Sequence, residues 1–246
     1  MRGNGSAPPL LAIEDLAVSY GAVPAVDGVS LEIHPGELRV ILGANGAGKT
    51  TIIKTVLGLL KPRRGRILLD GTQDLLRCRP HQIHRMGIAW VPEGRQLWST
   101  LTVMDNLRMG GFAVRDENRV AARIEEMLDR FPRLRERQNQ IAGSLSGGEQ
   151  QMVAIARALV SEPKLILMDE PSLGLAPKVV ADVFALVREI NAMGIAVLMV
   201  EQNAKQALKV AEWAYLLEVG HMIESGPAAE IAGKDSVREI FLGGRY

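Results

Sequence analysis

The sequence of 246 residues has a single cysteine, Cys78, few aromatic residues (4%) and almost no net charge (+1). One cysteine cannot form an intrachain disulfide, which is typical of a protein kept in a reducing compartment. The near-neutral balance argues against a dominant nucleic-acid footprint, because such a footprint needs a clear excess of lysine and arginine. No nucleic acid is therefore expected among the partners.

Long apolar runs are also missing, since none reaches the roughly 18 residues that a membrane-spanning helix needs. The first residues, MRGNGSAPP, lack the apolar centre of a signal peptide. We expect a disordered tail over 1–10. Any work at a membrane would then require docking on a protein that spans it. The 47% of hydrophobic residues nevertheless suffices for a sizeable core.

Short apolar runs alternate with segments of helical spacing along most of the chain, which is typical of an α/β protein. Strands are predicted over 11–20, 29–33, 38–42, 66–69, 87–91, 165–168, 196–200, 213–217 and 221–224. Helices are predicted over 49–60, 148–160, 177–192, 203–210 and 236–242. The charged segment 102–145 has helical spacing without a strand signal. We therefore predict a domain over 11–246, with a helical subdomain at about 95–160 inserted into an α/β core.

A glycine-rich stretch, GANGAGKT, follows one predicted strand and opens a predicted helix, as a G-x-x-x-x-G-K-[ST] phosphate loop does. Its glycines let backbone N–H groups close around phosphates, and the helix start adds partial positive charge. Lys49 is expected to reach the β- and γ-phosphates of ATP, and the Thr50 hydroxyl to ligate Mg²⁺. The alternative is an ordinary strand–turn–helix. The predicted nucleotide-binding residues here are Gly43, Ala44, Asn45, Gly46, Ala47, Gly48, Lys49, Thr50 and Thr51.

Two adjacent carboxylates, Asp169 and Glu170, end another apolar run. Acids at a buried strand end are costly unless cations compensate them. Asp169 is placed to hold Mg²⁺ through water, and Glu170 to polarise the attacking water. The alternative, a solvated strand end, is disfavoured because the same chain carries a phosphate loop.

A second glycine-rich stretch, LSGGEQ over 145–150, precedes a predicted helix and suits an anion. One nucleotide does not need two such loops. The simplest interpretation is that Ser146, Gly147, Gly148 and Glu149 grip the nucleotide of another copy or of a partner, which implies a head-to-tail dimer joined by ATP. The local alternative is a capping box, with Ser146 as N-cap and Glu149 as its partner.

In order and spacing, the motifs from residue 11 to residue 246 resemble those of the ATP-binding subunits of ABC transporters, and LSGGEQ resembles their signature motif. The resemblance implies an ATP-binding cassette, which combines a P-loop NTPase α/β core with an N-terminal antiparallel β subdomain and a helical subdomain. It also implies that Tyr20 stacks on adenine. The alternative for Tyr20 is an aromatic residue at a strand end.

Three positions depart from the usual pattern of that family. Glu93 stands where a glutamine is usual; its carboxylate can still ligate Mg²⁺, and the alternative is a salt bridge to Arg95 or another cation. Ala176 replaces an aspartate, so communication across a dimer through that carboxylate is not expected. The third is Gln202, in VEQN, where a histidine usually contacts the γ-phosphate.

Gln202 follows Glu201 at the end of an apolar run and precedes Asn203. A glutamine amide donates a hydrogen bond but carries neither a proton for transfer nor a positive charge. We expect Gln202 to position or sense the γ-phosphate, beside Glu170 as base and Glu93 as metal ligand. The alternative is that Gln202 only caps the following helix, although Asn203 is the better cap.

The stretches VPEGR, EPSLGLAP, VEQNAKQAL and FLGG resemble the ATP-binding subunits of branched-chain amino acid importers, with urea and short-chain amide importers close by. This implies a second ATP-binding subunit, two membrane permeases and an extracytoplasmic solute-binding protein, at the cytoplasmic face of the inner membrane. ATP binding and hydrolysis would close and open the dimer. The permeases are expected to dock near 95–107, where Leu97, Trp98 and Leu101 form either a docking patch or underlying core.

Two other classes are weighed against an importer ATPase. A soluble cassette ATPase of translation or DNA repair usually carries two cassettes or a long coiled-coil insert, and neither is seen here. A regulatory subunit with a crippled site is suggested by the three departures, but Glu170 argues against it.

Overall fold

The central sheet of the computed structural model, which describes residues 8–234, has the strand order β10-β9-β3-β8-β7-β6. The five strands from β9 to β6 pair in parallel, and β10 adds an antiparallel edge. Every residue of β3, β7 and β8 is buried, which explains why they read as continuous apolar runs. The strands are β3 (Leu38–Leu42), β6 (Ile88–Val91), β7 (Leu165–Asp169), β8 (Ala196–Glu201), β9 (Trp213–Glu218) and β10 (His221–Pro227).

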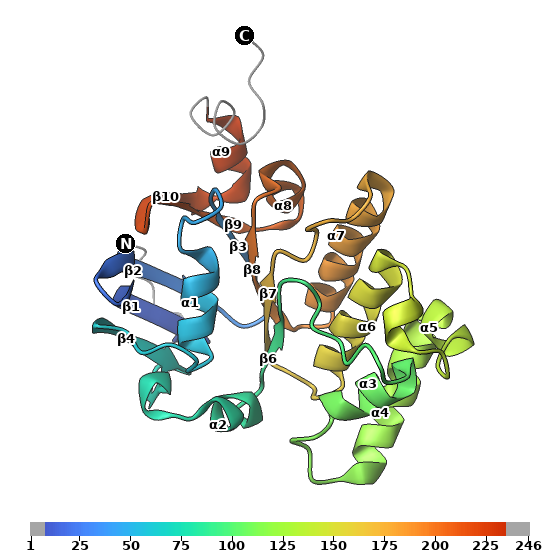
Figure 1. Cartoon of the computed structure of the whole chain (residues 1–246). Helices are drawn as coiled ribbons and strands as arrows, with labels where there is room; N and C mark the ends of the chain where they lie inside the picture. Colours follow the sequence, from blue (N-terminus) through green and yellow to red (C-terminus); the bar gives the residue numbers. More distant parts are fainter. Residues whose placement is uncertain (1–7, 235–246) are drawn as a thin grey trace.

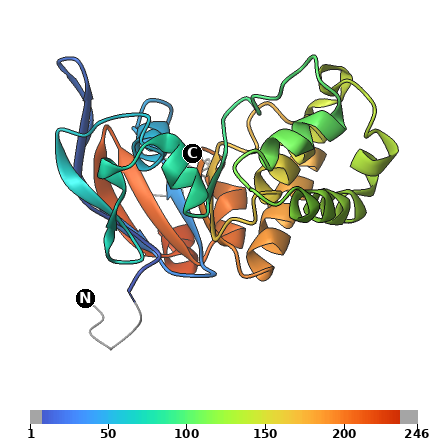
Figure 2. The same cartoon turned by 90° about the horizontal axis from the view of Figure 1, so that it is seen from below.

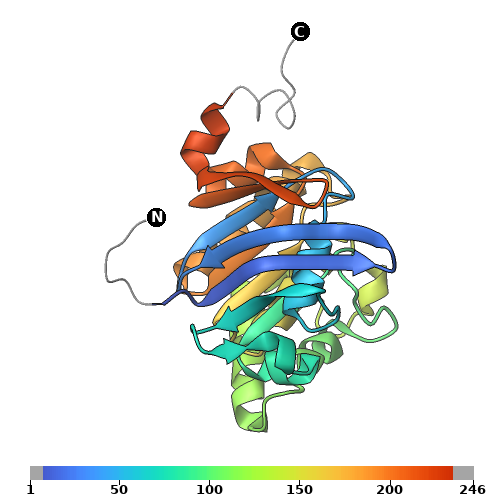
Figure 3. The ribbon, with the colours of Figure 1, turned by 90° about the vertical axis from the view of Figure 1, so that its left-hand side faces the viewer.

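A second, antiparallel sheet has the order β2-β1-β4-β5. Figure 3 shows β1 and β2 as two long adjacent strands crossing in front of the central sheet. The strands are β1 (Leu11–Tyr20), β2 (Val23–Ile33), β4 (Arg64–Leu69) and β5 (Gln73–Asp74). Both the α/β core and the N-terminal antiparallel sheet were expected, and the fold class is confirmed.

The helices fall into two groups around the central sheet (Figure 1). Helix α1 lies between the two sheets, and most others cover the opposite face. Seen from below, α3 to α6 gather on the side of the molecule away from the antiparallel sheet (Figure 2). The helices are α1 (Lys49–Val56), α2 (Pro80–Arg85), α3 (Val103–Gly110), α4 (Glu117–Arg130), α5 (Pro132–Glu136), α6 (Gly147–Leu159), α7 (Pro177–Ala192), α8 (Ala204–Val210) and α9 (Ala228–Gly233), with short 3₁₀ turns at η1 (Leu75–Arg77) and η2 (Ala142–Ser144).

The central sheet separates two hydrophobic cores. Side chains alternate along a strand, so Val40 packs with the helical side whereas the next residue, Ile41, packs with α1 and the antiparallel sheet. The same alternation continues in β8 with Val197 and Leu198. The sheet is therefore held from both faces, which makes it a firm platform for the loops at its edge.

Several predicted boundaries differ from the structure. The helix predicted to reach residue 60 ends at Val56, because Gly58 adopts a left-handed conformation (φ 71°). The second strand begins earlier, at Val23, because it pairs with β1 along most of its length. Helix α2 was not predicted. The helix expected over 236–242, and residues 1–7 of the expected tail, lie outside the described residues.

The parallel pairing places the carboxyl ends of β3, β6, β7 and β8 along one edge of the sheet. In open α/β sheets this edge is where ligands bind. The loops that follow these strands carry the phosphate loop, Glu93, Glu170 and Gln202. Four segments that are far apart in sequence are therefore brought to one place by the sheet.

The contact between β4 and β1 depends on the glycine at position 65. Gly65 has φ 104°, and a Cβ atom there would lie 2.7 Å from the Cα of Leu16. We expect Gly65→Ala to lower the free energy of unfolding by about 2–3 kcal/mol, since both the backbone and the strand spacing must yield. The control is Gly233→Ala, where a Cβ meets nothing within 4 Å. Urea unfolding of both variants measures the difference, and equal losses would contradict this account.

Candidate functional site

The loop between β3 and α1 is closely packed against the rest of the chain. A Cβ atom on Gly43 would lie 2.6 Å from the carbonyl oxygen of Leu217, and one on Gly48 would lie 2.5 Å from that of Ala25. Gly48 also has φ 106°. These two glycines are therefore required by the fold itself, because no other residue fits without displacing backbone.

The buried ammonium of Lys49 lies at the centre of this loop. Its Nζ donates to the carbonyl oxygens of Gly43 (2.9 Å) and Ala44 (3.1 Å). The same Nζ lies 3.0 Å from Oε1 of Glu170, which is also buried. The cation that Glu170 needs is thus the lysine of the phosphate loop. Because Asp169 and Glu170 are both buried, the solvated-strand-end alternative for these acids is wrong.

Asp169 is almost fully buried (1% exposed), and only one of its two carboxylate oxygens has a hydrogen-bond partner. The hydroxyl of Thr50 donates to its Oδ1 at 2.9 Å, whereas Oδ2 has no hydrogen-bond partner. Burial raises the pKa of Asp169 to about 6; the Thr50 hydrogen bond opposes this, while the charges of Glu93 and Glu170 add to it. A buried carboxylate oxygen without a donor fits a cation ligand.

The residues around Asp169 fit Mg²⁺ in particular. Within 8–234, no three or more His, Cys, Asp or Glu side chains gather into a metal cluster. Mg²⁺ is usually held by one or two carboxylates together with substrate phosphates, rather than by a cage of protein ligands. Thr50 and Asp169 next to a phosphate loop match that arrangement.

A cavity of about 470 Å³ lies over the phosphate loop, and most residues of that loop line it together with Tyr20. Tyr20 is half exposed at the end of β1, and its hydroxyl lies 3.3 Å from that of Thr51. Gly43, Ala44, Ala47 and Asp169 do not line this cavity; Ala44 is exposed and, with Ala47, lines a neighbouring cavity of about 210 Å³. The lining residues are Tyr20, Val23, Pro24, Ala25, Asn45, Gly46, Gly48, Lys49, Thr50, Thr51, Glu93, Glu170 and Leu173.

Glu93 reaches this cavity from the loop after β6. Its side chain is exposed and forms no ion pair with any residue of the described range. The alternative of a salt bridge to Arg95 is therefore wrong. Arg95 turns instead toward α6, where its Nη1 lies 3.4 Å from Oε1 of Gln150. Glu93 remains available on the cavity wall.

The segment 146–149 lies at the start of α6 and does not line this cavity. It forms the capping box: the Ser146 hydroxyl accepts from the N–H of Glu149, and Oε2 of Glu149 accepts from the N–H of Ser146 at 3.0 Å. The Ser146 hydroxyl also donates to that carboxyl, which lowers the pKa of Glu149. The cap exists, and the backbone N–H groups of Gly147 and Gly148 are not used by it.

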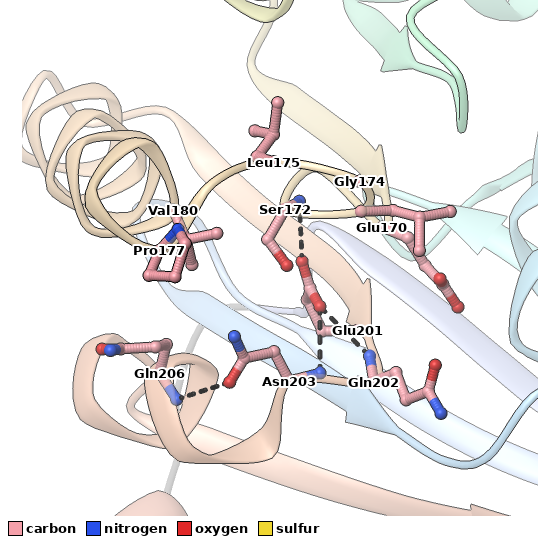
Figure 4. A pocket seen from close by; sticks show the side chains of 11 residues that line it. Glu170, Ser172, Gly174, Leu175, Pro177, Val180, Glu201, Gln202, Asn203 and Gln206 are labelled. Carbon is pink, nitrogen blue, oxygen red and sulfur yellow. Dashed lines mark hydrogen bonds between the residues drawn. The ribbon is translucent and has the colours of Figure 1, made fainter. Parts of the chain in front are cut away.

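Gln202 follows β8 and lines a second cavity, next to Glu170 (Figure 4). The residue that caps α8 is Asn203, whose side chain accepts from the N–H of Gln206 at 3.3 Å. The alternative that Gln202 serves only as a cap is therefore wrong. The Gln202 side chain is exposed at the same edge of the central sheet as Glu170.

One residue of this region was not assigned a role from the sequence. Glu201 is buried, and it accepts hydrogen bonds from the N–H groups of Ser172, Gln202 and Asn203. The signal was present, because a carboxylate at the end of an apolar run needs a donor. Its donors are backbone groups, however, which no residue pattern reveals.

In the segment expected to meet the permeases, some of the apolar side chains are exposed and others are packed against the core. Trp98 is 45% exposed, and the guanidinium of Arg157 lies 5.0 Å from its ring centre. Leu97 packs against the helical core, and Leu101 is half-buried. The docking-patch interpretation therefore fits Trp98, and the core interpretation fits Leu97. A cavity of about 320 Å³ beside Trp98 is also lined by Trp90 and Met109.

The comparisons with known proteins agree with this geometry. Residues 26–173 match the family described as ABC transporter. The chain is 44% identical over 235 residues to the high-affinity branched-chain amino acid transport ATP-binding protein BraG of Pseudomonas aeruginosa, covering 96% of this chain and 100% of BraG. It is 34% identical over 240 residues to the lipopolysaccharide export system ATP-binding protein LptB of Haemophilus influenzae, covering 96% and 98%.

Among solved structures, the ADP conformation of MJ1267, an ATP-binding cassette of an ABC transporter, superposes with a TM-score of 0.85 at 29% identity. That match covers 96% of this chain and 100% of MJ1267. The chain belongs to the ABC transporter family. It is an ATP-binding cassette ATPase, a nucleotide-binding subunit of a transporter whose permeases span the membrane.

The resemblance to ATP-binding subunits of branched-chain amino acid transport is confirmed by the similarity to BraG. The chain is also 32% identical to the probable branched-chain amino acid transport ATP-binding protein LivF of Archaeoglobus fulgidus, which is matched over 99% of its length. Within the described part of the chain, no helix combines the length and the apolar character that crossing a membrane requires.

The burial of Asp169 predicts a pH-dependent stability. Because its pKa is raised from 3.8 to about 6 in the folded chain, the folded state binds more protons between these values. The stabilisation is complete below the unfolded pKa and is lost as the pH rises through about 6. Asp169→Asn should therefore raise Tm at about pH 7.5 in chelator without nucleotide, and this advantage should shrink toward about pH 4.

The matched control is Asp182→Asn on the exposed face of α7. Removing that solvated charge should leave the pH profile of Tm unchanged. If Asp169→Asn raised Tm by the same amount at every pH, the charge of Asp169 would not be what destabilises the fold.

Proposed function

We propose that this chain is the ATP-hydrolysing subunit of an importer for branched-chain amino acids. The observation that carries the proposal is the meeting of Lys49, Asp169 and Glu170 at one edge of the sheet, over a phosphate loop. The similarity to BraG over its whole length supports the substrate class. Similarity to LptB makes lipopolysaccharide export the second candidate, at lower identity.

The residues proposed to bind the nucleotide are those of the phosphate loop together with Tyr20. Thr50, Asp169 and Glu93 would hold Mg²⁺, which neutralises charge on the β- and γ-phosphates when bound. Support comes from the unpartnered Oδ2 of Asp169 and from the exposure of Glu93 on the cavity over the phosphate loop. Tyr20 offers a half-exposed ring at the rim, which suits stacking on adenine.

Glu170 is proposed as the base that polarises the attacking water. Lys49 now shares its protons among Gly43, Ala44 and Glu170. A phosphate group competes for the same ammonium because it carries more negative charge than a carboxylate. When Lys49 turns to the phosphate, the Glu170 carboxylate is free to accept a proton from water.

The position of 146–149 supports a head-to-tail dimer. These residues do not line the cavity of their own phosphate loop, so they would act on a nucleotide held by another copy or by a second ATP-binding subunit. Gly147 and Gly148 would supply backbone N–H groups at the start of α6, while Ser146 and Glu149 hold the helix end in shape. ATP would close this dimer, and hydrolysis would open it.

The remaining partners follow from the transporter class. Two permeases would dock beside Trp98 at the cytoplasmic face of the inner membrane, and an extracytoplasmic solute-binding protein would deliver the amino acid to them. Support for the docking position comes from the exposed Trp98 and the cavity beside it. The division into an α/β core and a helical subdomain at about 95–160 is part of this proposal.

The proposal is tested by ATP hydrolysis of the purified chain, alone and with its second subunit. Glu170→Gln should lower kcat roughly 10²- to 10⁴-fold, the range expected when a general base is lost. Glu189→Gln, on the exposed face of α7, is the control and should hydrolyse ATP at the wild-type rate. Equal rates for wild type and Glu170→Gln would show that Glu170 is not the base.

Gln202 generates a second test. If it positions the γ-phosphate through a neutral hydrogen bond, Gln202→Ala should slow turnover about tenfold and leave the ADP affinity unchanged, because ADP lacks that phosphate. Gln206→Ala is the matched control, since it lines the same cavity from α8. Steady-state kinetics and ADP titration separate the two effects. Unchanged turnover would remove Gln202 from the site.

A further inference from the structure

Glu201 is a buried carboxylate without a cation. It is 2% exposed at the end of β8, and it forms no ion pair within residues 8–234. A buried charge of this kind persists only where hydrogen bonds compensate its lost hydration. Its three backbone donors are therefore not incidental, and their positions show what the carboxylate connects.

The two oxygens of Glu201 accept from two different loops (Figure 4). Oε1 accepts from the N–H of Ser172 at 3.0 Å, in the loop after β7. Oε2 accepts from the N–H groups of Gln202 and Asn203, both at 3.1 Å, in the segment between β8 and α8. One side chain thus joins the loop that begins with Glu170 to the segment that carries Gln202.

The loop after β7 needs such an anchor because its first residue is strained. Glu170 has φ 45°, a left-handed conformation that a non-glycine residue adopts at a cost of roughly 1–2 kcal/mol. Its N–H donates to the carbonyl oxygen of Val200 at 3.0 Å, and Ser172 is held by Glu201. The loop is tied to β8 at two points on either side of the strained backbone.

We propose that Glu201 is a positioning residue for ATP hydrolysis, which holds the backbone of the Glu170 loop and the backbone of the Gln202 segment in one fixed relation. Figure 4 shows the side chains of Glu170 and Gln202 extending from these two segments toward the same side. The inference rests on the proposed roles of Glu170 and Gln202. Glu201 acts through both and does not contact the nucleotide itself.

A carboxylate suits this task better than an amide. An ionised carboxylate only accepts hydrogen bonds, whereas a glutamine amide has one accepting oxygen and a donating nitrogen. In Glu201→Gln, the nitrogen must face either the N–H of Ser172 or the N–H groups of Gln202 and Asn203. One of the two loops therefore loses its anchor, although the side-chain volume is kept.

The cavity beside Glu201 gives a released loop room to move. It has a volume of about 470 Å³ and lies between the two loops that Glu201 joins. Leu173 and Gly174, next to Ser172, are exposed on its wall. Loss of the anchor is therefore expected to change the placement of Glu170 and Gln202 rather than to collapse the core.

The test compares ATP hydrolysis by wild type, Glu201→Gln and Glu201→Asp. We expect Glu201→Gln to lower kcat at least about tenfold and to leave the ADP affinity within about twofold, because the phosphate loop is untouched. Glu201→Asp keeps both accepting oxygens on a shorter stem and should recover part of kcat. An unchanged kcat in Glu201→Gln would overturn the proposal.

The control is Asn191→Asp, which also alters a hydrogen-bonding anchor, here a partly buried one, without changing its size. Asn191 Nδ2 donates to the carbonyl oxygens of Gly36 (2.7 Å) and Ile195 (3.1 Å), near the opposite end of β8. This variant should lose thermal stability but keep the wild-type kcat. If both variants lose kcat in proportion to Tm, Glu201 has only a structural role and the proposal is wrong.

The double variant Glu201→Gln with Gln202→Ala tests the coupling. If Glu201 acts partly through Gln202, the loss of kcat in the double variant should be smaller than the product of the two single losses. A loss of kcat in the double variant equal to the product of the two single losses would overturn the coupling to Gln202.

A further measurement needs no variant. In the wild-type full chain, the amide protons of Ser172, Gln202 and Asn203 should exchange slowly with solvent, because they donate to a buried carboxylate. Exchange at the rate of exposed loop amides would overturn the proposal even if the variants fail to fold. Failure of wild type to hydrolyse ATP would instead refute the proposed function, and exchange would still report on the Glu201 connection.

Discussion

The placement of buried charge at one edge of the central sheet constrains the rest of this molecule. Lys49, Asp169 and Glu170 are all buried, and the two carboxylates are compensated only in part, because Lys49 pairs with Glu170 whereas Asp169 has only the Thr50 hydroxyl. Such a group is tolerated inside a protein only when its geometry is fixed by surrounding hydrogen bonds. Two hydrophobic cores, one on each face of the sheet, supply that fixity, and the incomplete compensation leaves the edge ready for a further cation and phosphates.

The two glycines of the signature segment serve the chain's own packing as well as any partner. A Cβ atom on Gly148 would lie 2.7 Å from Cγ1 of Val179 on α7, and one on Gly147 would lie 3.2 Å from the Arg95 guanidinium. The capping box likewise uses the side chains of Ser146 and Glu149 and leaves backbone N–H groups over. Local capping and binding across a dimer are therefore compatible, although the sequence presents them as alternatives.

Motifs formed by consecutive residues could be predicted from the sequence. Contacts with backbone groups that are distant in the sequence could not. The phosphate loop and Asp169–Glu170 are local patterns that follow recognisable strands. The fold class, and the proximity of the phosphate loop to the two acids, could therefore be predicted from the sequence. The Glu201 anchor joins Ser172 across 29 positions through an N–H group that every residue but proline has. Similarly, the turn of Arg95 toward α6 depends on a backbone with φ 68°, which its neighbours in sequence do not indicate.

Helix α6 begins at the signature segment and ends beside the exposed Trp98. Near its last turn, Arg157 donates to the carbonyl oxygens of Arg95 and Gln96 and covers the Trp98 ring. With 13 residues, the helix is about 20 Å long. If a permease docks at Trp98 as proposed, a displacement there would be carried to Ser146 along one continuous helix.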